Sequence, residues 1–274
     1  MNRPALSHGL FKVVVATCLL GIPLATAAND TTLTNKEIEE FLLTAKIVGA
    51  KPAQIGSTHS LRLTLSDGKL THDAHYQPID EHKAITQMAN GRTEMNFADS
   101  YKYNIAAYRL AEMLGLDDMV PVYIERKYKG DSGSFSWWLP VKMNEEQRVK
   151  QKVEVPDADA WNNQMYRVRV FDQLVYDDDA NLTNVIIDND WKIWRVDFSR
   201  AFRLKKGLRD PGDLVRCNRQ LLERLKKLDG DQLVERTKHF LTKDEVKAVM
   251  IRREMIVERF QQLITEKGEA AVLY

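Results

Sequence analysis

The chain has very little cysteine and no excess of charge of either sign. Its 274 residues include two cysteines, and 40 Lys and Arg nearly balance 39 Asp and Glu, for a formal net charge of +1. A balanced charge gives no electrostatic case for a nucleic-acid partner. No stretch approaches the roughly 18 consecutive apolar residues of a membrane helix, so we expect no stable membrane span in the mature chain. There is also no internal repeat and no low-complexity tract.

The N-terminus has the pattern of a secretory signal peptide over residues 1–27. Arg3 and Lys12 supply positive charge, an apolar run follows, and the tripeptide that ends at Ala27 is a small-x-small cleavage site. We therefore expect the protein to be exported, periplasmic or secreted, after cleavage near Ala27. Two alternatives stay open, an uncleaved N-terminal anchor and a lipoprotein that would use Cys18.

Removal of this segment leaves 274 − 27 = 247 residues and, because it takes two basic residues with it, a net charge of −1. That length is enough for one large domain or two lobes with a substantial core. Cys217 is then the only cysteine, so no internal disulfide can form and the domain must be stable by core packing. We expect Cys217 to be a half-buried structural residue on a helix.

The first half of the mature chain reads as strands around one long helix. Its hydrophobic patterns and turn signals predict a helix over 33–46 with a capping box of Thr34 and Glu37, strands over 58–66 and 69–77 joined at Asp67-Gly68, a helix over 98–114 ended by Gly115, and strands over 120–128 and 135–141.

The second half reads as mostly helical. A polar connector over 142–160 precedes a helix whose apolar residues recur at helical spacing, then come a hairpin of strands 185–187 and 191–196 and helices over 213–228, 230–240 and 243–267. This order predicts an α+β fold with two lobes, a small β-rich N-lobe over 28–141 and a helical C-lobe over 161–274. Regular strand–helix alternation, as in a doubly wound sheet, is not seen.

Three polar residues surround the hairpin of the second half. Asn184 follows Asp179 by five residues, and Asp197 comes thirteen residues later, after the hairpin. If the hairpin closes, its two ends lie side by side and bring Asn184 next to Asp197. Amide and carboxylate oxygens are the ligands that Mg²⁺ accepts besides phosphate and water. Two other interpretations compete, a solvated acidic turn at 177–179 and a calcium loop, although Leu182 stands where an EF-hand needs glycine.

These residues carry a resemblance to a known family. The segment 171–202 resembles the atypical protein-kinase-like superfamily, in a bacterial branch similar to phosphatidylinositol 3-/4-kinase-like, HipA-type and CotH-type kinases. The family's Asp-Arg-His-x-x-Asn pattern is matched at Asp179 and Asn184, without the Arg-His. Asp197-Phe198-Ser199 stands where protein kinases carry Asp-Phe-Gly.

The resemblance extends upstream and covers roughly residues 55–205. His75-Tyr76-Gln77-Pro78 is similar to the family's strand that ends in Tyr-Lys-Pro, and 103–110 is similar to its Arg-Glu-Val-Ala-Ala-Tyr-Arg-Leu helix. It implies a two-lobed protein-kinase-like fold and a phosphotransferase that uses ATP or another nucleoside triphosphate with Mg²⁺ or Mn²⁺ to phosphorylate a hydroxyl on a protein, lipid or glycan.

The resemblance also implies roles for individual residues. Asp179 would orient the attacking hydroxyl, and Asn184 and Asp197 would hold metal. Gly56 and Ser57 would approach the phosphates through backbone N–H groups. Arg200 and Arg203, just after Asp197, would be placed to meet an acidic or phosphorylated substrate.

One departure from the family concerns charge. Kinases hold the phosphates with a strand lysine paired to a helix glutamate, and those positions here are Gln77 and Asn104. The two amides can hydrogen-bond each other, whereas loss of one charge alone would leave the other unpaired. Three interpretations follow. Another cation would substitute, with Lys69, Arg62 and Lys102 as candidates, or the enzyme would work with a neutral pair. In the third, the protein would be a pseudokinase, which is a binding or regulatory module outside the cytoplasm. The sequence leaves it undecided whether the protein is an active enzyme.

Overall fold

The computed structural model describes residue 1 and residues 33–53, 60–87, 91 and 93–274. The expected signal peptide lies outside the described residues, and so do Gly56 and Ser57. No helix within the described ranges is both long and apolar enough to cross a membrane. The lobe boundaries stay a prediction, since 33–274 form one compact unit.

An antiparallel sheet of five strands forms the first half of this unit. In spatial order its strands are β1 (Lys46–Pro52), β2 (Leu61–Ser66), β3 (Thr71–Gln77), β7 (Asp131–Trp137) and β6 (Tyr123–Tyr128). Side chains alternate between its two faces, as strand geometry requires. One face is apolar and buried, with Leu63, Leu65, Ala74, Tyr76 and Phe135. The other carries polar groups on neighbouring strands, because Gln77 lies opposite Ser134 and His75 opposite both Arg62 and Ser136.

Two helices accompany the sheet, and local signals set their ends. Helix α1 (Asn35–Thr44) begins at the predicted capping box of Thr34 and Glu37, which is confirmed. Helix α2 (Tyr101–Leu114) ends at Gly115, whose φ of 63° is left-handed, and a Cβ there would lie 1.0 Å from Arg224 Nη1. Glycine is favoured at such a position, because a side chain there would be strained at this φ and would displace the end of Arg224. Helix α2 contacts β6 and β7 as well as the C-terminal helices, so it joins the two halves.

A hairpin between β3 and α2 was not predicted. Strands β4 (Asp80–Gln87) and β5 (Thr93–Ser100) pair only with each other, and nearly all of β4 is exposed. The predicted helix over 98–114 therefore starts three residues too early, because 98–100 complete β5. Asn90-Gly91 is a strong hairpin signal in the sequence, but the polar flanking segments hide it from a search for apolar alternation.

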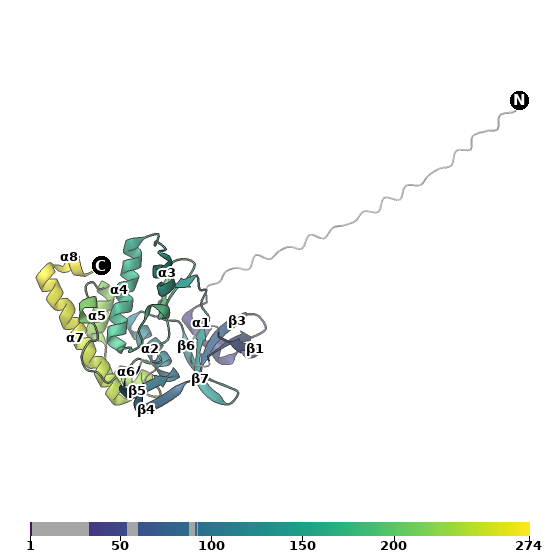
Figure 1. Cartoon of the computed structure of the whole chain (residues 1–274), viewed down its shortest axis with the longest axis horizontal. Helices are drawn as coiled ribbons and strands as arrows, with labels where there is room; N and C mark the ends of the chain where they lie inside the picture. The colour runs from purple at the N-terminus through teal and green to yellow at the C-terminus, as the bar shows by residue number, and fades with distance from the viewer. Residues whose placement is uncertain (2–32, 54–59, 88–90, 92) are drawn as a thin grey trace. The chain divides into compact units, whose positions relative to one another are not determined.

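The second half is helical around a small sheet. Its elements are β8 (Met143–Asn144), α3 (Glu145–Gln151), α4 (Ala158–Val175), η1 (Leu182–Asn184), β9 (Val185–Ile187), β10 (Ile193–Arg195), η2 (Pro211–Asp213), α5 (Arg219–Lys227), α6 (Gly230–Thr237), α7 (Lys243–Lys267) and α8 (Glu269–Val272). Strand β8 extends the predicted hairpin into three strands, in the order β10-β9-β8. The connector is thus partly regular structure. In Figure 1, strands β1, β3, β6 and β7 lie together with α1, and α4, α5, α7 and α8 gather on the other side of α2.

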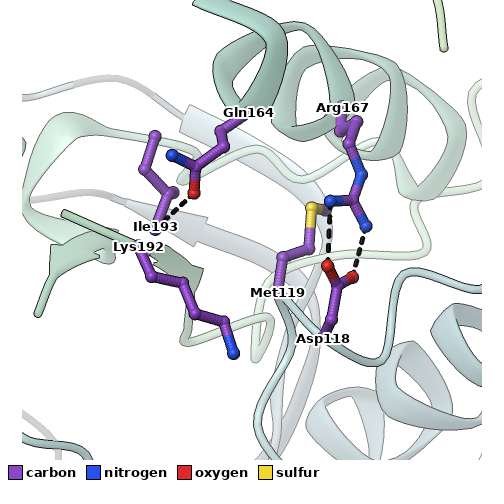
Figure 2. A pocket seen from close by; sticks show the side chains of 6 residues that line it. All are labelled: Asp118, Met119, Gln164, Arg167, Lys192 and Ile193. Atoms are coloured by element: carbon purple, nitrogen blue, oxygen red, sulfur yellow. Dashed lines mark hydrogen bonds and ion pairs between the residues drawn. The ribbon is translucent and has the colours of Figure 1, made fainter. Parts of the chain in front are cut away.

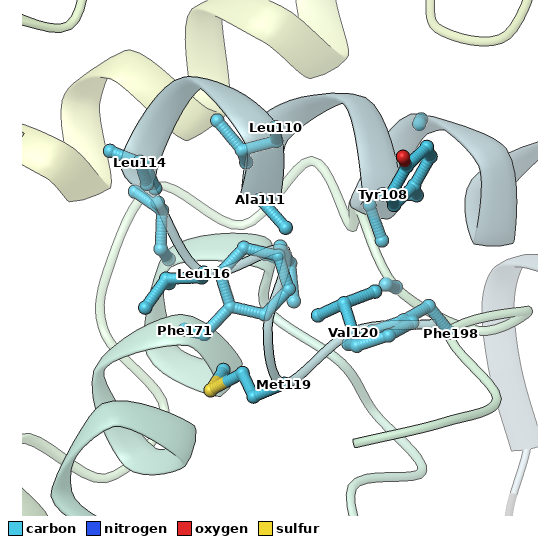
Figure 3. Packing of buried hydrophobic residues seen from close by; sticks show 14 of the residues in the cluster. Tyr108, Leu110, Ala111, Leu114, Leu116, Met119, Val120, Phe171 and Phe198 are labelled. Atoms are coloured by element: carbon cyan, nitrogen blue, oxygen red, sulfur yellow. The ribbon is translucent and has the colours of Figure 1, made fainter. Parts of the chain in front are cut away.

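The buried core beneath α2 extends to the β9–β10 hairpin, which follows the polar loop. Figure 3 shows Leu110 and Ala111 of α2 above Phe171 of α4, with Phe198 beside them. Phe171 and Phe198 are fully buried and meet edge to face, with ring centroids 5.5 Å apart. Such aromatic pairs add about 0.5–1.5 kcal/mol beyond the area they bury. Phe198 is the neighbour of Asp197, so core packing fixes the backbone at this candidate site residue.

The structure confirms the α+β class, with a β-sheet N-terminal region and a helical C-terminal region. It corrects the surroundings of Cys217. The predicted helix over 213–228 begins only at Arg219, where Asn218 caps it, and Cys217 forms a parallel bridge with Leu273. The thiol is fully buried rather than half-buried, and burial raises the pKa of Cys217 to about 12. A long-range contact with the C-terminus overrides helix propensity there.

Candidate functional site

The polar loop places Asp179 in an exposed turn after α4. The backbone N–H of Asp179 donates to Asp177 Oδ1 over 2.9 Å, and Asn184 Nδ2 donates to the Asp179 carbonyl over 3.2 Å. Turns of this kind fix the backbone through the side chains of neighbouring residues. Both bonds use backbone atoms of Asp179 and neither uses its side chain. The carboxylate of Asp179 is therefore left facing solvent.

The hairpin joins Asn184 to Asp197 as the sequence predicts. Val185 pairs with Arg195, and the N–H of Val196 donates to the Asn184 carbonyl over 3.0 Å. Asn184 and Asp197 thus flank the open end of one antiparallel ladder. Asp188 closes its other end by accepting hydrogen bonds from the N–H groups of Asp190 and Lys192, each over 3.0 Å.

Asp197 adopts a backbone conformation that few residues with a side chain use. Its φ is 58°, in the left-handed region, which costs roughly 1–3 kcal/mol and persists where the surroundings impose it. Its N–H donates to the hydroxyl of Tyr123, and its Oδ1 accepts from the N–H of Ser199, both over 3.4 Å. Burial raises the pKa of Tyr123, and the charge of Asp197 adds to the rise, so the phenol stays protonated.

A buried ion cluster holds the loop from below. Arg195 is fully buried and pairs with Asp172 over 2.9 Å and with Asp177. Burial raises the pKa of both carboxyl groups, against the lowering effect of the nearby guanidinium. Loss of one partner of such a pair costs about 3–5 kcal/mol, because the other charge stays buried. The cluster therefore fixes the loop through side chains other than Asp179, Asn184 and Asp197.

The three predicted residues keep their oxygens available for a ligand. Among the residues that the structure describes, Asp179 and Asp197 make no salt bridge, and Asn184 uses its amide N–H rather than its oxygen. Asp99, at the end of β5, also has a buried Oδ1 without a hydrogen-bond partner there. Burial raises the pKa of Asp99, and the charge of Asp197 adds to the rise.

These groups fit a divalent cation chemically. An orphaned carboxylate oxygen near a second carboxylate is an environment that a cation would relieve. Within the described ranges, no three or more His, Cys, Asp or Glu side chains are grouped to hold a metal on their own. The residues present suit Mg²⁺, which takes one or two carboxylates and completes its shell with phosphate and water.

On the sheet side, Gln77 and Asn104 form the predicted amide pair. Asn104 Nδ2 donates to Gln77 Oε1 over 2.6 Å, and Asn104 Oδ1 accepts from the N–H of Phe198 over 2.7 Å. Both side chains are buried. Asn104 thus links β3, α2 and the residue after Asp197 through hydrogen bonds of its amide group.

The three cations considered as substitutes lie in different surroundings. Lys102 pairs with Asp80 over 2.7 Å, and Lys69 is exposed in the turn at the far end of β3 from Gln77, more than about 20 Å away along a strand of seven residues. Arg62 lies on the same sheet face as His75 and Gln77. Its guanidinium stands 4.2 Å from the ring centroid of Trp138 and pairs with Asp73.

Arg200 and Arg203 are already engaged. Both pair with Glu94 of β5 over 2.6 Å, and Arg203 also pairs with Asp178 over 2.8 Å. Glu94 and Arg203 are buried, so these arginines fasten the unpredicted hairpin to the segment after Asp197. The interpretation that they await an acidic substrate does not fit this geometry. Glu94 was missed because nothing local to its sequence indicates a partner more than a hundred residues away.

A small hollow elsewhere has a structural role. It encloses about 10 Å³, the space of a single water. Figure 2 shows its lining: Gln164 Oε1 accepts from the N–H of Ile193 over 2.8 Å, and Arg167 pairs with Asp118. The first contact ties β10 to α4, and the second ties α4 to the loop after α2. They leave no room for a substrate.

No protein-family model matches the chain, and no curated protein matches it. Among solved structures, the chain is similar to a Helicobacter pylori proinflammatory kinase, CtkA. That similarity has a TM-score of 0.49 and 8% sequence identity, over 83% of this chain and 97% of the other. A likeness of this size assigns no activity and no residue role. In the chain's own topology, the third strand and α2 carry the amide pair, and a polar loop and a hairpin follow in the second half.

Proposed function

We propose that the protein is an exported phosphotransferase that moves the terminal phosphoryl group of a nucleoside triphosphate to a hydroxyl acceptor. The observation that carries this proposal is the ladder that sets Asn184 beside Asp197, with Asp179 presented from the turn to which Asn184 is bonded. Each of these side chains keeps an oxygen available, while the buried pairs of Arg195 stabilise the loop.

In this proposal each residue has one task. Asp179 accepts the proton of the acceptor hydroxyl. The hydroxyl oxygen bonds to the terminal phosphorus as the bond from that phosphorus to the nucleoside diphosphate breaks. Asn184 and Asp197 hold Mg²⁺ or Mn²⁺, which when bound neutralises charge on the phosphates. Gln77 and Asn104 line the phosphate side, where a glutamine amide can donate a hydrogen bond without a charge.

The test is thermal unfolding of the purified protein with and without ATP and Mg²⁺ or Mn²⁺. A ligand that binds only the folded state stabilises it, by about 2.7 kcal/mol at a hundredfold excess over Kd, and therefore raises the melting temperature. We expect a metal-dependent rise that Asp197→Ala abolishes and that Asp190→Ala, in the exposed turn of the same hairpin, retains. The proposal is wrong if Asp197→Ala keeps both metal-dependent nucleotide binding and transfer activity.

The neutral amide pair favours a second candidate, a pseudokinase that acts as an extracytoplasmic binding or regulatory module. Asn104 satisfies both Gln77 and the N–H of Phe198, so the pair is stable without any phosphate. A folded protein that shows no shift with any nucleotide or metal would support this candidate over the enzyme.

Export is proposed from the pattern of residues 1–27 alone. The test is N-terminal sequencing of the protein recovered from the cell envelope and the medium. A mature chain that starts just after Ala27 would support it, and an intact N-terminus in the cytoplasm would overturn it.

A further inference from the structure

A groove of about 610 Å³ lies between the β4–β5 hairpin and the segment after Asp197. Its walls come from both strands of the hairpin, from residues 202–205, and from single residues at the start of α2 and α7. The volume is within the range of sites that bind a ligand or a few side chains.

The groove has an apolar floor and exposed apolar edges. Phe97 and Phe202 contribute rings to its lining, and Met95 and Leu204 flank it with 70% and 53% of their surfaces exposed. Single exposed apolar residues are ordinary, but apolar residues gathered at a concave site are typical of binding surfaces. The groove therefore suits a partner with at least one apolar side chain.

The charges that remain open in the groove are positive. Its one acidic residue, Glu245, is buried and accepts hydrogen bonds from Tyr103 and from the N-terminal cap of α7. Lys205 has no carboxylate within salt-bridge distance in the described part of the chain, whereas Lys83 pairs with Glu81 over 2.6 Å. Because both side chains of that pair are about half exposed, the pair contributes little and another carboxylate can replace Glu81. An occupant with negative charge complements this rim.

The groove is joined to the candidate catalytic loop by one ion pair. Arg203 lines the groove and pairs over 2.8 Å with Asp178, the neighbour of Asp179. One wall of the groove begins at Phe202, five residues after Asp197. Five residues span at most about 17 Å, so Phe202 lies within that distance of Asp197. A chain segment held in the groove is therefore within a few residues' reach of Asp179.

We propose that this groove docks an acidic protein segment that carries an apolar side chain, and that the segment belongs to the acceptor. The inference rests on the proposed phosphotransferase for its second half and makes the acceptor a protein. A membrane surface is disfavoured, because lipid-binding patches generally cluster about 4–8 Lys and Arg, whereas the described lining of this groove offers Lys205 and the half-exposed Lys83, with Arg203 already paired.

The experiment measures fluorescence polarisation of labelled peptides with the full protein, without nucleotide. One peptide alternates glutamate with leucine and contains one serine, a second replaces glutamate by lysine, and a third replaces leucine by glycine. We expect binding of the first alone, weakened at least tenfold by Lys83→Glu with Lys205→Glu, and also weakened by Leu204→Ser. The matched control, Lys69→Glu with Lys227→Glu, makes the same charge change on exposed sites away from the groove.

Three results would overturn the docking site: no binding of the acidic peptide below about 1 mM, equal loss in the groove and control variants, or preference for anionic phospholipid vesicles over the peptide. The nucleotide-dependent thermal shift separates the two proposals. Peptide binding without any shift would leave the groove as the site of a binding module. A shift without peptide binding would leave the enzyme and remove this acceptor.

Discussion

The sheet side and the loop side of the candidate site hold their polar groups in opposite ways. On the sheet side, Gln77 and Asn104 are neutral, buried and bonded to each other. On the loop side, Arg195 is buried between two carboxylates, while Asp179 and Asp197 are left to face a ligand. A buried neutral pair needs no counter-charge, whereas buried charge must be paired and hydrogen-bonded.

The difference indicates where a ligand's charge would be balanced. A nucleoside triphosphate carries negative charge, and the sheet side offers it hydrogen bonds without a cation, apart from Arg62 on the same face. The loop side offers carboxylates, which attract a divalent metal rather than phosphate. Charge compensation at this site would therefore depend on metal more than in a kinase with the lysine–glutamate pair.

Restoring that ion pair should have the largest effect on this contrast. Gln77→Lys or Asn104→Glu alone leaves a buried charge without its partner, and we expect each to lower the free energy of unfolding by about 3–5 kcal/mol. The double variant should recover part of this loss and bind ATP with Mg²⁺ more tightly, through a charge-assisted hydrogen bond. Urea unfolding and nucleotide titration of all four proteins measure both. Strictly additive losses would show that the two positions are not coupled.

Removing the neutral network should come next in size. Asn104→Leu leaves the oxygen of Gln77 without this donor and the N–H of Phe198 without this acceptor. Because an unsatisfied buried group costs about 1–3 kcal/mol, we expect a loss of about 2–4 kcal/mol in urea unfolding. Asn162→Leu, exposed on α4, is the control and should change stability by less than about 0.5 kcal/mol. Equal effects would mean that the network adds no stability.

Acidification should have the smallest effect, and its sign differs between His72, on the apolar face of the sheet, and Asp177, beneath the polar loop. Burial lowers the pKa of His72 on β3, so below its unfolded pKa of about 6.5 the unfolded state binds the proton first and stability is lost as pH falls. Burial raises the pKa of Asp177 to about 6, so the folded state binds its proton first and stability rises as pH falls from about 6 toward the ordinary carboxyl range.

His72→Phe isolates the contribution of His72 to the pH dependence of the free energy of unfolding. The ring of His72 stacks on Trp137 with centroids 3.5 Å apart, and phenylalanine keeps a ring there without a titrating group. We expect the wild type to lose stability relative to the variant as the pH falls from 7.5 to 5.5, measured by urea unfolding at both values. The contribution of Asp177 cancels in this difference. Parallel pH profiles of the two proteins would contradict the assignment.

Local patterns in the sequence were enough to predict many elements. The capping box at Thr34, the left-handed Gly115 and the hairpin that closes on Asn184 are confirmed, because each depends on residues a few positions apart. The spacing of Asp179, Asn184 and Asp197 also predicted that they would meet at one loop. The roles of these residues stay proposals.

Other features depend on partners that are distant in the chain. Glu94 meets Arg203 across 109 positions, Asn104 meets Phe198 across 94, and Cys217 meets Leu273 at the C-terminus. Nothing local to these residues specifies such partners, since burial and charge pairing are settled only when the elements pack together. For this reason capping, turns, spacing and the pairing of two amides could be predicted from the sequence, whereas the use of Arg200 and Arg203, the bond from Phe198 to Asn104 and the groove beside the hairpin required the folded structure.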